Sequence, residues 1–442
     1  MNRSLRIAMF VGTFPVLSET FILRQIAGLL DLGHSVNIYA DCRAEPSMPI
    51  QPEVEKHQLM ERVTFMDMPP ESAPWEIPAW PLFGRTWPPG AEKSVHNCVR
   101  LARSIPKLLT CLKSHPQLTI QMLQPGQYGY QARSLSALYR LAKLISQRRR
   151  YDVLHAHFGP VGNSFRFARE LWNAPLIVSF HGYDFSTIPR KEGKDVYQKL
   201  FAKTDVVTVN SEYTRCQVEG LGCPASKIQK LPVGLNLDQF AFRERSVKAG
   251  EPIRLLTVGR LVEIKGHEYA IRAFAEVKQQ HPAIFYDIVG DGPLRPKLEK
   301  LISELGLQNS VILHGAKDTS ALRPIMDSAH IFLLASVSIE GDQEGQGLVV
   351  QEAQACGLPV IATEHGALPE GFMRGSSGFL VVERDSDAIV ERLSFLIEHP
   401  ERWPAMGRFG RKFVEEKYDI HNLNLQLNEI YGQALESYWR RS

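Results

Sequence analysis

Two cations in one glycine-containing turn are the first residues of this chain that suggest chemistry. Arg260 and Lys265 follow an apolar run of strand type, in the segment from Val258-Gly259-Arg260-Leu261 to Lys265-Gly266. A guanidinium and a nearby ammonium bind a diphosphate and neutralise the charge that grows on it during group transfer, without a metal ion. A surface arginine and lysine at an ordinary strand–helix turn are the alternative. We predict that both cations are catalytic.

A pair of glutamates eight residues apart is the most specific signal. Glu344 lies in the loop 341–347, and Glu352 lies inside the helix predicted to follow. Carboxylates suit vicinal hydroxyls because each oxygen accepts independently, so we expect Glu344 to hold sugar hydroxyls and Glu352 the hydroxyls of a ribose. The alternative is that the two acids only stabilise the N-terminal end of the helix, where negative charge is favourable. Backbone N–H groups at this start would bind a phosphate, and they belong to Gly345, Gln346 and Gly347.

Three further glycines are expected to line the same pocket. Gly290 ends the run Ile288-Val289 and precedes Asp291-Gly292-Pro293, while Gly315 follows His314. A glycine at such a turn lets the backbone approach a ligand closely. Gly12 opens the turn predicted after the first apolar run, and it brings backbone amides to the pocket edge.

A histidine is expected on the opposite wall. His181 ends the buried run 176–180 and is followed by Gly182, so we predict that it points into the pocket; a core histidine is the alternative. His155 and His157 share one face of a strand, but no third ligand accompanies them. We therefore predict no metal site.

Length and composition fit an enzyme of two domains. The chain has 442 residues, of which 44% are hydrophobic and 22% charged, as in soluble globular enzymes. No apolar run reaches the roughly 18 residues of a spanning helix. The six cysteines show no C-x-x-C pattern, which indicates reduced thiols and a cytoplasmic location.

The candidate residues need a scaffold of parallel strands. Apolar runs alternate with helical patterns in both halves, which predicts an α/β fold with two parallel sheets facing a cleft at their carboxyl edges. We place the first domain at 1–235, the second at 236–419, and a helix crossing back to the first at 420–442. Residues 46–89 hold ten prolines and three tryptophans and are interpreted as an irregular insertion, either a flap or a surface loop.

The positive charge is concentrated in one region. Residues 93–169 contain 13 lysines and arginines and one acid, Asp152. Two stretches of helical spacing, 99–114 and 135–151, carry most of them. Two interpretations stay open: a solvated amphipathic surface, or a docking face for anionic lipid or a lipid-diphosphate acceptor. Nucleic acid is not expected, because no reader motif accompanies the charge.

The motifs as a set resemble those of the family 4 glycosyltransferases of GT-B fold, over essentially the whole chain. The second half carries V-G-R-L…K-G at 258–266, I-V-G-D-G-P at 288–293 and the Glu-x7-Glu pair. The first half is similar to bacterial exopolysaccharide transferases of the colanic acid and amylovoran type, with F-P-V-L-S-E-T-F at 14–21, H-A-H-F-G-P at 155–160 and F-H-G-Y-D at 180–184.

The resemblance implies a role for each residue. Arg260 and Lys265 would bind the diphosphate, Glu344 the donor sugar, Glu352 the ribose, and His181 the sugar near the reacting carbon. It further implies a retaining, metal-independent hexosyltransferase without a cofactor. Its donor would be a nucleotide diphosphate-sugar and its acceptor a lipid-linked exopolysaccharide or other surface glycan, at the inner face of the cytoplasmic membrane.

Two departures from the family pattern affect these roles. Many members have phenylalanine where this chain has Gln346, and many carry two or more glycines where Gly12 stands alone. A nucleotide-sugar epimerase and a non-catalytic nucleotide-sugar-binding partner of an export complex remain as alternative functions. The sugar, the base, the acceptor, the linkage and the oligomeric state are not indicated by the sequence.

Overall fold

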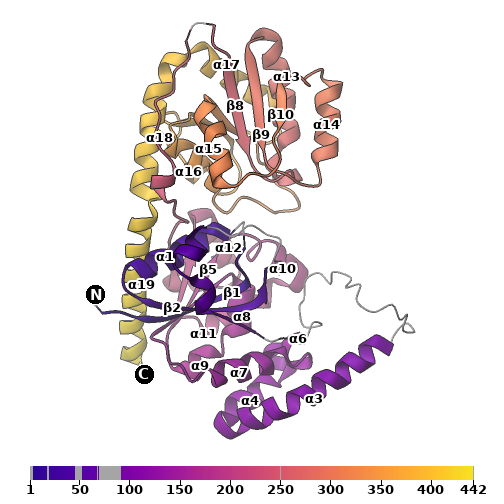
Figure 1. Cartoon of the computed structure of the whole chain (residues 1–442), viewed down its shortest axis with the longest axis vertical. Helices are drawn as coiled ribbons and strands as arrows, with labels where there is room; N and C mark the ends of the chain where they lie inside the picture. The colour runs from indigo at the N-terminus through magenta and orange to yellow at the C-terminus, as the bar shows by residue number, and fades with distance from the viewer. Residues whose placement is uncertain are drawn as a thin grey trace.

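The structure is a computed structural model that describes residues 3–16, 19–44, 52–66, 68, 91–248 and 250–441. Two domains follow one another along the long axis of the molecule (Figure 1). The last helix, α19 (Ile420–Arg441), leaves the second domain and returns alongside the first.

A seven-stranded parallel sheet forms the first domain. Its strand order is β3-β2-β1-β4-β5-β6-β7, so the order reverses between β1 and β4. In such sheets ligands bind outside the carboxyl ends of the strands at this reversal. Strands β4 and β5 are buried along their whole length, as expected for central strands of a parallel sheet. The strands are β1 (Arg6–Phe14), β2 (Ser35–Arg43), β3 (Val63–Phe65), β4 (Val153–His157), β5 (Leu176–Phe180), β6 (Val206–Val209) and β7 (Ile228–Lys230).

Helices cover this sheet, and one group extends from it. Helices α3 and α4 lie at the end of the domain farthest from the second domain (Figure 1). The helices are α1 (Thr20–Asp31), α2 (Pro52–Lys56), α3 (Ala91–Ser114), α4 (Pro116–Met122), α5 (Pro125–Tyr128), α6 (Tyr130–Arg133), α7 (Ser136–Ser146), α8 (Gly159–Phe165), α9 (Ala168–Trp172), α10 (Thr187–Glu192), α11 (Gln198–Lys203) and α12 (Glu212–Gly220).

The second domain repeats the same topology with a six-stranded parallel sheet in the order β10-β9-β8-β11-β12-β13. Its strands are β8 (Ile253–Val258), β9 (Ile284–Val289), β10 (Val311–Leu313), β11 (Ile331–Leu334), β12 (Val360–Thr363) and β13 (Gly378–Val381). Its helices are α13 (His267–Gln280), α14 (Arg295–Glu304), α15 (Thr319–Ser328), α16 (Leu348–Ala355), α17 (Ser386–Glu398) and α18 (Trp403–Lys417). The predicted pair of parallel sheets is confirmed.

Both faces of the second sheet are buried. Ile331 and Leu333 of β11 belong to a core shared with α13, α14 and α17. The alternate residues Phe332 and Leu334 belong to a second core with α15 and α16. Because successive side chains of a strand point to opposite faces, this alternation is the signature of a sheet with helices on both sides.

Helix α19 is part of the first domain by packing. Its Leu427 and Tyr431 are fully buried within the core of the first domain, and the helix lies against α1. Just before α19, Asp419 forms a β-bridge with Leu235. This bridge joins the segment that leads into α19 to the link between the two domains.

The interpretation of residues 46–89 as irregular is wrong for 52–66. This part forms α2, a 3-10 turn (Leu59–Arg62) and the edge strand β3, which pairs with β2. Val54 and Leu59 are buried and anchor it, but three-residue strands are too short to show an alternating pattern. Within the predicted insertion, residues 46–51, 67 and 69–89, with the three tryptophans, lie outside the described part of the chain.

Candidate active site

A buried ion pair joins two of the predicted residues. The Nζ of Lys265, in the turn after β8, lies 2.5 Å from Oε1 of Glu344, and both side chains are largely buried, with 15% and 13% exposed. Ser336 Oγ donates to the same carboxylate oxygen at 3.1 Å. Burial alone would raise the pKa of Glu344, but the charge and hydrogen bond of Lys265 outweigh it and hold this pKa below its usual value. The carboxylate is therefore ionised and acts as an acceptor.

The backbone of Glu344 is held by residues that the sequence did not indicate. Its N–H donates to Nε2 of His365 at 3.0 Å, and Nδ1 of this buried histidine lies 2.9 Å from Oε1 of Glu383. Because Nε2 accepts, the neutral ring carries its proton on Nδ1 and donates it to Glu383. Glu383 also accepts from the N–H of Ser338 at 2.7 Å. This chain of contacts fixes the loop that carries Glu344.

Arg260 stands apart from this ion pair. Its side chain is exposed, and among the described residues no acid lies within ion-pair distance of the guanidinium. Its carbonyl oxygen lies 3.0 Å from Nε2 of His267, which anchors the turn. The structure therefore brings Lys265 to Glu344 and leaves Arg260 available to an anionic ligand.

Gly290 and Gly315, which were predicted from separate turns, are in direct backbone contact. The N–H of Gly290 donates to the carbonyl of Gly315 at 2.9 Å. Gly290 has φ +143°, and a Cβ there would overlap the carbonyl oxygen of Gly259. The ends of β8, β9 and β10 thus pack backbone against backbone, which only glycine permits.

The loop after Glu344 is in contact with the first domain. Gly345 packs on His181, since a Cβ at Gly345 would overlap the carbonyl oxygen of His181. The side-chain amide of Gln346 bonds both to the N–H of Val233, at 2.7 Å, and to its carbonyl, at 2.9 Å. Gly347 has φ +72° and precedes α16. The side chain of Gln346 therefore joins the domains.

Glu352 faces the first domain from α16. Burial raises its pKa to about 7, and the charge of Arg24 on α1 opposes this rise. Arg24 is only 6% exposed; its Nη2 donates to Oε1 of Gln239 at 3.2 Å. Its Nε and Nη1 have no hydrogen-bond partner among the described residues. A polar group placed between the two domains here would meet a carboxyl and a guanidinium.

His181 lies at the carboxyl end of β5 and pairs with another histidine. Its Nε2 lies 3.1 Å from Nδ1 of His157, at the end of β4. Burial lowers the pKa of His181 to about 3, so the ring is neutral. The buried carboxyl of Asp184 accepts from the N–H groups of His181, Gly182 and Gly159 and shapes the loop.

The turn predicted to start at Gly12 begins later than expected. Strand β1 continues to Phe14 and pairs with β2 as far as Arg43, so Gly12 lies inside the strand. A Cβ at Gly12 would meet a methyl group of Val161 at an ordinary 3.8 Å. Residues 17 and 18, which follow the turn, lie outside the described part of the chain.

Ion pairs and capping contacts join the domains around this site. Asp342 pairs with Arg190 at 2.8 Å and accepts from Thr187 of α10 at 3.2 Å. Glu370 pairs with Lys230 at 2.6 Å. It also accepts from the first two N–H groups of α12, at 2.9 Å each, so a carboxylate from the second domain caps a helix of the first.

Two family models match this chain in succession. The model described as Glycosyltransferase Family 4 matches residues 90–239, and that described as Glycosyl transferases group 1 matches residues 238–413. A glycosyltransferase named for colanic acid biosynthesis in Salmonella typhimurium is 31% identical over 433 residues, covering 96% of this chain and 99% of the relative. The chain is a family 4 glycosyltransferase.

Further relatives of this glycosyltransferase agree. One named for amylovoran biosynthesis in Erwinia amylovora is 30% identical and covers 96% of this chain and 99% of the relative. A glycosyltransferase structure from Rickettsia africae superposes with a TM-score of 0.69 at 18% identity, covering 98% of this chain and 99% of that one. The Anabaena protein HepE in complex with UDP gives 0.66 at 15% identity, covering 97% and 100%. The fold is GT-B, and the resemblance seen in the motifs is confirmed.

Proposed function

We propose that this glycosyltransferase moves a hexosyl group from a nucleotide diphosphate-sugar to a lipid-linked exopolysaccharide or other cell-surface glycan, with retention of anomeric configuration and without a metal ion. The names of the relatives, which refer to colanic acid and amylovoran, support the class of product. The UDP bound to the structurally similar HepE supports the class of donor.

One contact carries the assignment of the site. Gly345 packs on the carbonyl of His181, so the loop with Glu344 meets the strand end with His181 across the domains. Glu344 is ionised beside Lys265, and His181 is neutral. An ionised acceptor beside a cation suits a sugar diphosphate, since the sugar needs hydrogen bonds and the diphosphate needs positive charge.

The donor would be held by residues of the second domain. Arg260 and Lys265 bind the diphosphate, Glu344 accepts from sugar hydroxyls, and Glu352 accepts from the ribose. In the transfer, the bond from the anomeric carbon to the phosphate oxygen breaks while a bond to the acceptor oxygen forms on the same face. The acceptor proton passes to the departing phosphate oxygen, whose growing charge the two cations stabilise.

Helix α3 is the proposed contact with the membrane that holds the lipid-linked acceptor. Leu101, Ile105 and Leu109 are 59%, 57% and 63% exposed and follow one another at four-residue spacing, so they form one stripe. Arg103 and Lys113 are exposed on the same helix. Lys113 continues the four-residue spacing of this stripe, and an apolar stripe that ends in a cation suits the surface of an anionic membrane. No helix in the described part of the chain is long and apolar enough to span a bilayer.

The basic region is less uniform than its sequence indicated. Arg140 is buried and pairs with Asp41 at 2.8 Å, and Arg169 pairs with Asp205 at 3.0 Å. Arg166 is buried and donates to the carbonyl of Gln127 at 2.6 Å. These three cations stabilise the first domain, so the proposed membrane contact rests on α3.

The test is transfer of sugar by the purified protein. UDP-, GDP-, ADP- and dTDP-sugars are screened by thermal shift, and the donor that binds is then supplied with membrane lipid-linked oligosaccharides, with and without EDTA. We expect transfer that EDTA does not change, and NMR of the product showing the donor's anomeric configuration. Conversion of the donor without acceptor would instead indicate an epimerase. Donor binding without transfer or hydrolysis would indicate a non-catalytic partner, and an inverted product would overturn retention.

A further inference from the structure

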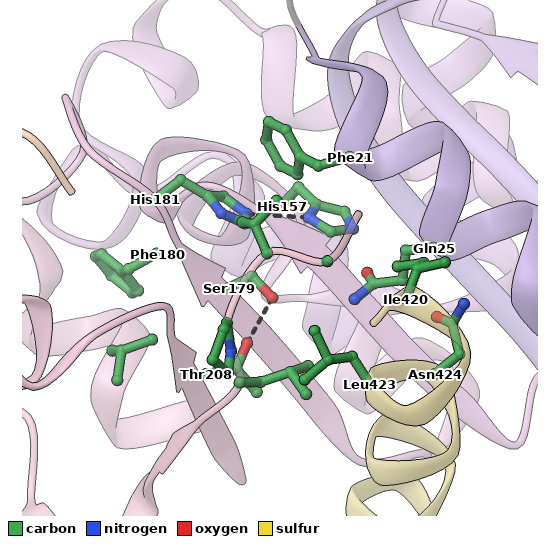
Figure 2. A pocket seen from close by; sticks show the side chains of 15 residues that line it. Phe21, Gln25, His157, Ser179, Phe180, His181, Thr208, Ile420, Leu423 and Asn424 are labelled. Atoms are coloured by element: carbon green, nitrogen blue, oxygen red, sulfur yellow. Dashed lines mark hydrogen bonds between the residues drawn. The ribbon is translucent and has the colours of Figure 1, made fainter. Parts of the chain in front are cut away.

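A small polar cavity lies behind His181, where the first domain meets α19. It has a volume of about 20 Å³, which is room for roughly one water molecule. Figure 2 shows its walls: Gln25 comes from α1, His157 and His181 come from β4 and the end of β5, and Asn424 comes from α19.

Four polar atoms of these walls have no protein partner among the described residues. They are Oε1 of Gln25, Nε2 of His157, Nδ1 of His181 and Oδ1 of Asn424, all fully buried. A buried polar atom without a hydrogen bond destabilises the folded state, and four of them around one cavity indicate that a ligand serves them together.

The histidine pair restricts what this ligand can be. Burial lowers the pKa of both rings, so each is neutral and carries one proton. One of these protons lies in the bond between His157 and His181. Whichever ring donates it, the pair then offers one N–H donor and one nitrogen acceptor through its remaining nitrogens.

The two amide oxygens complete the pattern. Oε1 of Gln25 and Oδ1 of Asn424 both need donors. Together with the histidine nitrogen that carries no proton they make three acceptors, against the one histidine N–H, so a fitting neutral ligand accepts once and donates more than once. Water accepts from the N–H and donates to two of the three acceptors, the two amide oxygens among them, whereas a sugar hydroxyl donates to only one.

We propose that this cavity binds one water molecule that joins the histidine pair to Gln25 and Asn424, and that His157 is thereby a positioning residue for His181. The inference rests on the proposed function and on the role beside the donor sugar that the family resemblance implies for His181. Asn424 is itself fixed, because it fills the space that a Cβ at Gly28 of α1 would occupy. The water therefore links the imidazole of the site to the helix that returns from the second domain.

The experiment compares two equal substitutions on α19. Asn424→Leu removes the amide oxygen from the cavity. Asn428→Leu, one turn later, removes an amide oxygen that lies 3.1 Å from Nε2 of His34, a histidine away from the site. Transfer kinetics, melting temperature and the ¹⁵N spectrum of labelled His181 are measured in both variants, together with a high-resolution crystal structure of the wild-type protein.

We expect one water in the cavity, and a kcat about tenfold lower in Asn424→Leu through misplacement of His181, with little change in KM. The His181 ring signals shift in this variant, and Asn428→Leu keeps the wild-type kcat and spectrum. Equal kcat in both variants, or a cavity that is dry or filled by a substrate hydroxyl, overturns the inference. Absence of transfer in the wild-type protein while the water is present would count against the proposed function alone.

Discussion

The side-chain amide of Gln346 is bonded to both backbone polar groups of Val233, so one residue of the second domain is paired with the link that leaves the first. Each partner serves as donor and acceptor, as in a strand ladder. Replacing Gln346 leaves the N–H and carbonyl of Val233 without these partners. The two domains are then held together by fewer contacts at the candidate site.

Gln346→Leu is expected to weaken the contact between the domains by about 1–2 kcal/mol, since two hydrogen bonds are lost, and so to let them move apart. Small-angle scattering should show a larger radius of gyration, and KM for the donor should rise. Gln343→Leu is the matched control, because Gln343 bonds at 2.8 Å to Ser338 within the second domain. An unchanged radius in Gln346→Leu would show that this contact does not control closure.

The pair of Lys265 and Glu344 allows stability and catalysis to be separated. Lys265→Met leaves a buried carboxylate without its cation, so we expect about 3 kcal/mol less stability as well as a large loss of turnover. In the double variant with Glu344→Gln the stability should largely return, because no buried charge is left, while turnover stays low. Denaturation by urea and transfer assays measure the two effects. Recovery of turnover in the double variant would contradict the proposed role of Glu344.

The binding of nucleotide should depend on pH through Glu352. Its pKa is raised to about 7 by burial, and only the ionised carboxylate accepts from both ribose hydroxyls. Affinity for the nucleoside diphosphate should therefore rise between pH 6 and about pH 8, and Glu352→Gln should remove this rise. Calorimetry over this range measures it.

Glu352 also predicts how stability changes with pH. Its folded pKa lies above the unfolded value near 4.5, so the folded state keeps its proton longer. This contribution is complete below about pH 4.5 and is lost as pH rises through about 7. Arg24 opposes the raised pKa, so Arg24→Met should move the loss to higher pH. A midpoint that stays in place would show that the two groups do not interact.

The contacts that stabilise the Glu344 loop lead to a graded test. His365→Gln keeps an acceptor near the N–H of Glu344, whereas His365→Leu removes it. We expect a kcat roughly tenfold lower for the leucine variant, because the carboxylate is misplaced, and a smaller loss for the glutamine variant. Similar kcat values for the two variants at equal melting temperature would show that the acceptor for the N–H of Glu344 does not affect turnover.

The sequence predicted a strand correctly wherever an apolar run and the turn after it could be recognised within one short segment. Strands β8 and β9 are mostly apolar runs followed by glycine turns, and the structure has them where this pattern predicts. Strands β3, β7 and β13 were not predicted. Each is an edge strand of three or four residues, which is too short for a periodic signal and is defined by its neighbour.

The supports of the candidate site were less predictable than its charged residues. Lys265 and Glu344 stand in recognisable motifs, but the partner of Gln346 is 113 residues away, and Glu383 is 18 residues from His365. Such pairs arise only when separate strands and loops are brought together, so no local pattern marks them. Arg140 is a further example, because the sequence places this cation in a basic surface region, whereas in the structure it is buried and paired with Asp41.

The apolar stripe of α3 gives a prediction that concerns the membrane. Leu101, Ile105 and Leu109 are exposed on one face, so replacing all three by glutamine should leave the fold unchanged. Binding to vesicles rich in anionic lipid should fall strongly, since each side chain loses most of its contact with the acyl region. Co-sedimentation with vesicles measures binding, and circular dichroism confirms the fold.

Two comparisons make that experiment decisive. Vesicles of neutral lipid should bind the wild-type protein weakly, because the cations of α3 gain little from them, and added salt should weaken binding to anionic vesicles. Transfer to an acceptor freed of its lipid should be the same for the wild-type and triple variants, since α3 lies at the end of the first domain far from the second (Figure 1). Equal binding of both proteins to anionic vesicles would remove α3 as the membrane contact.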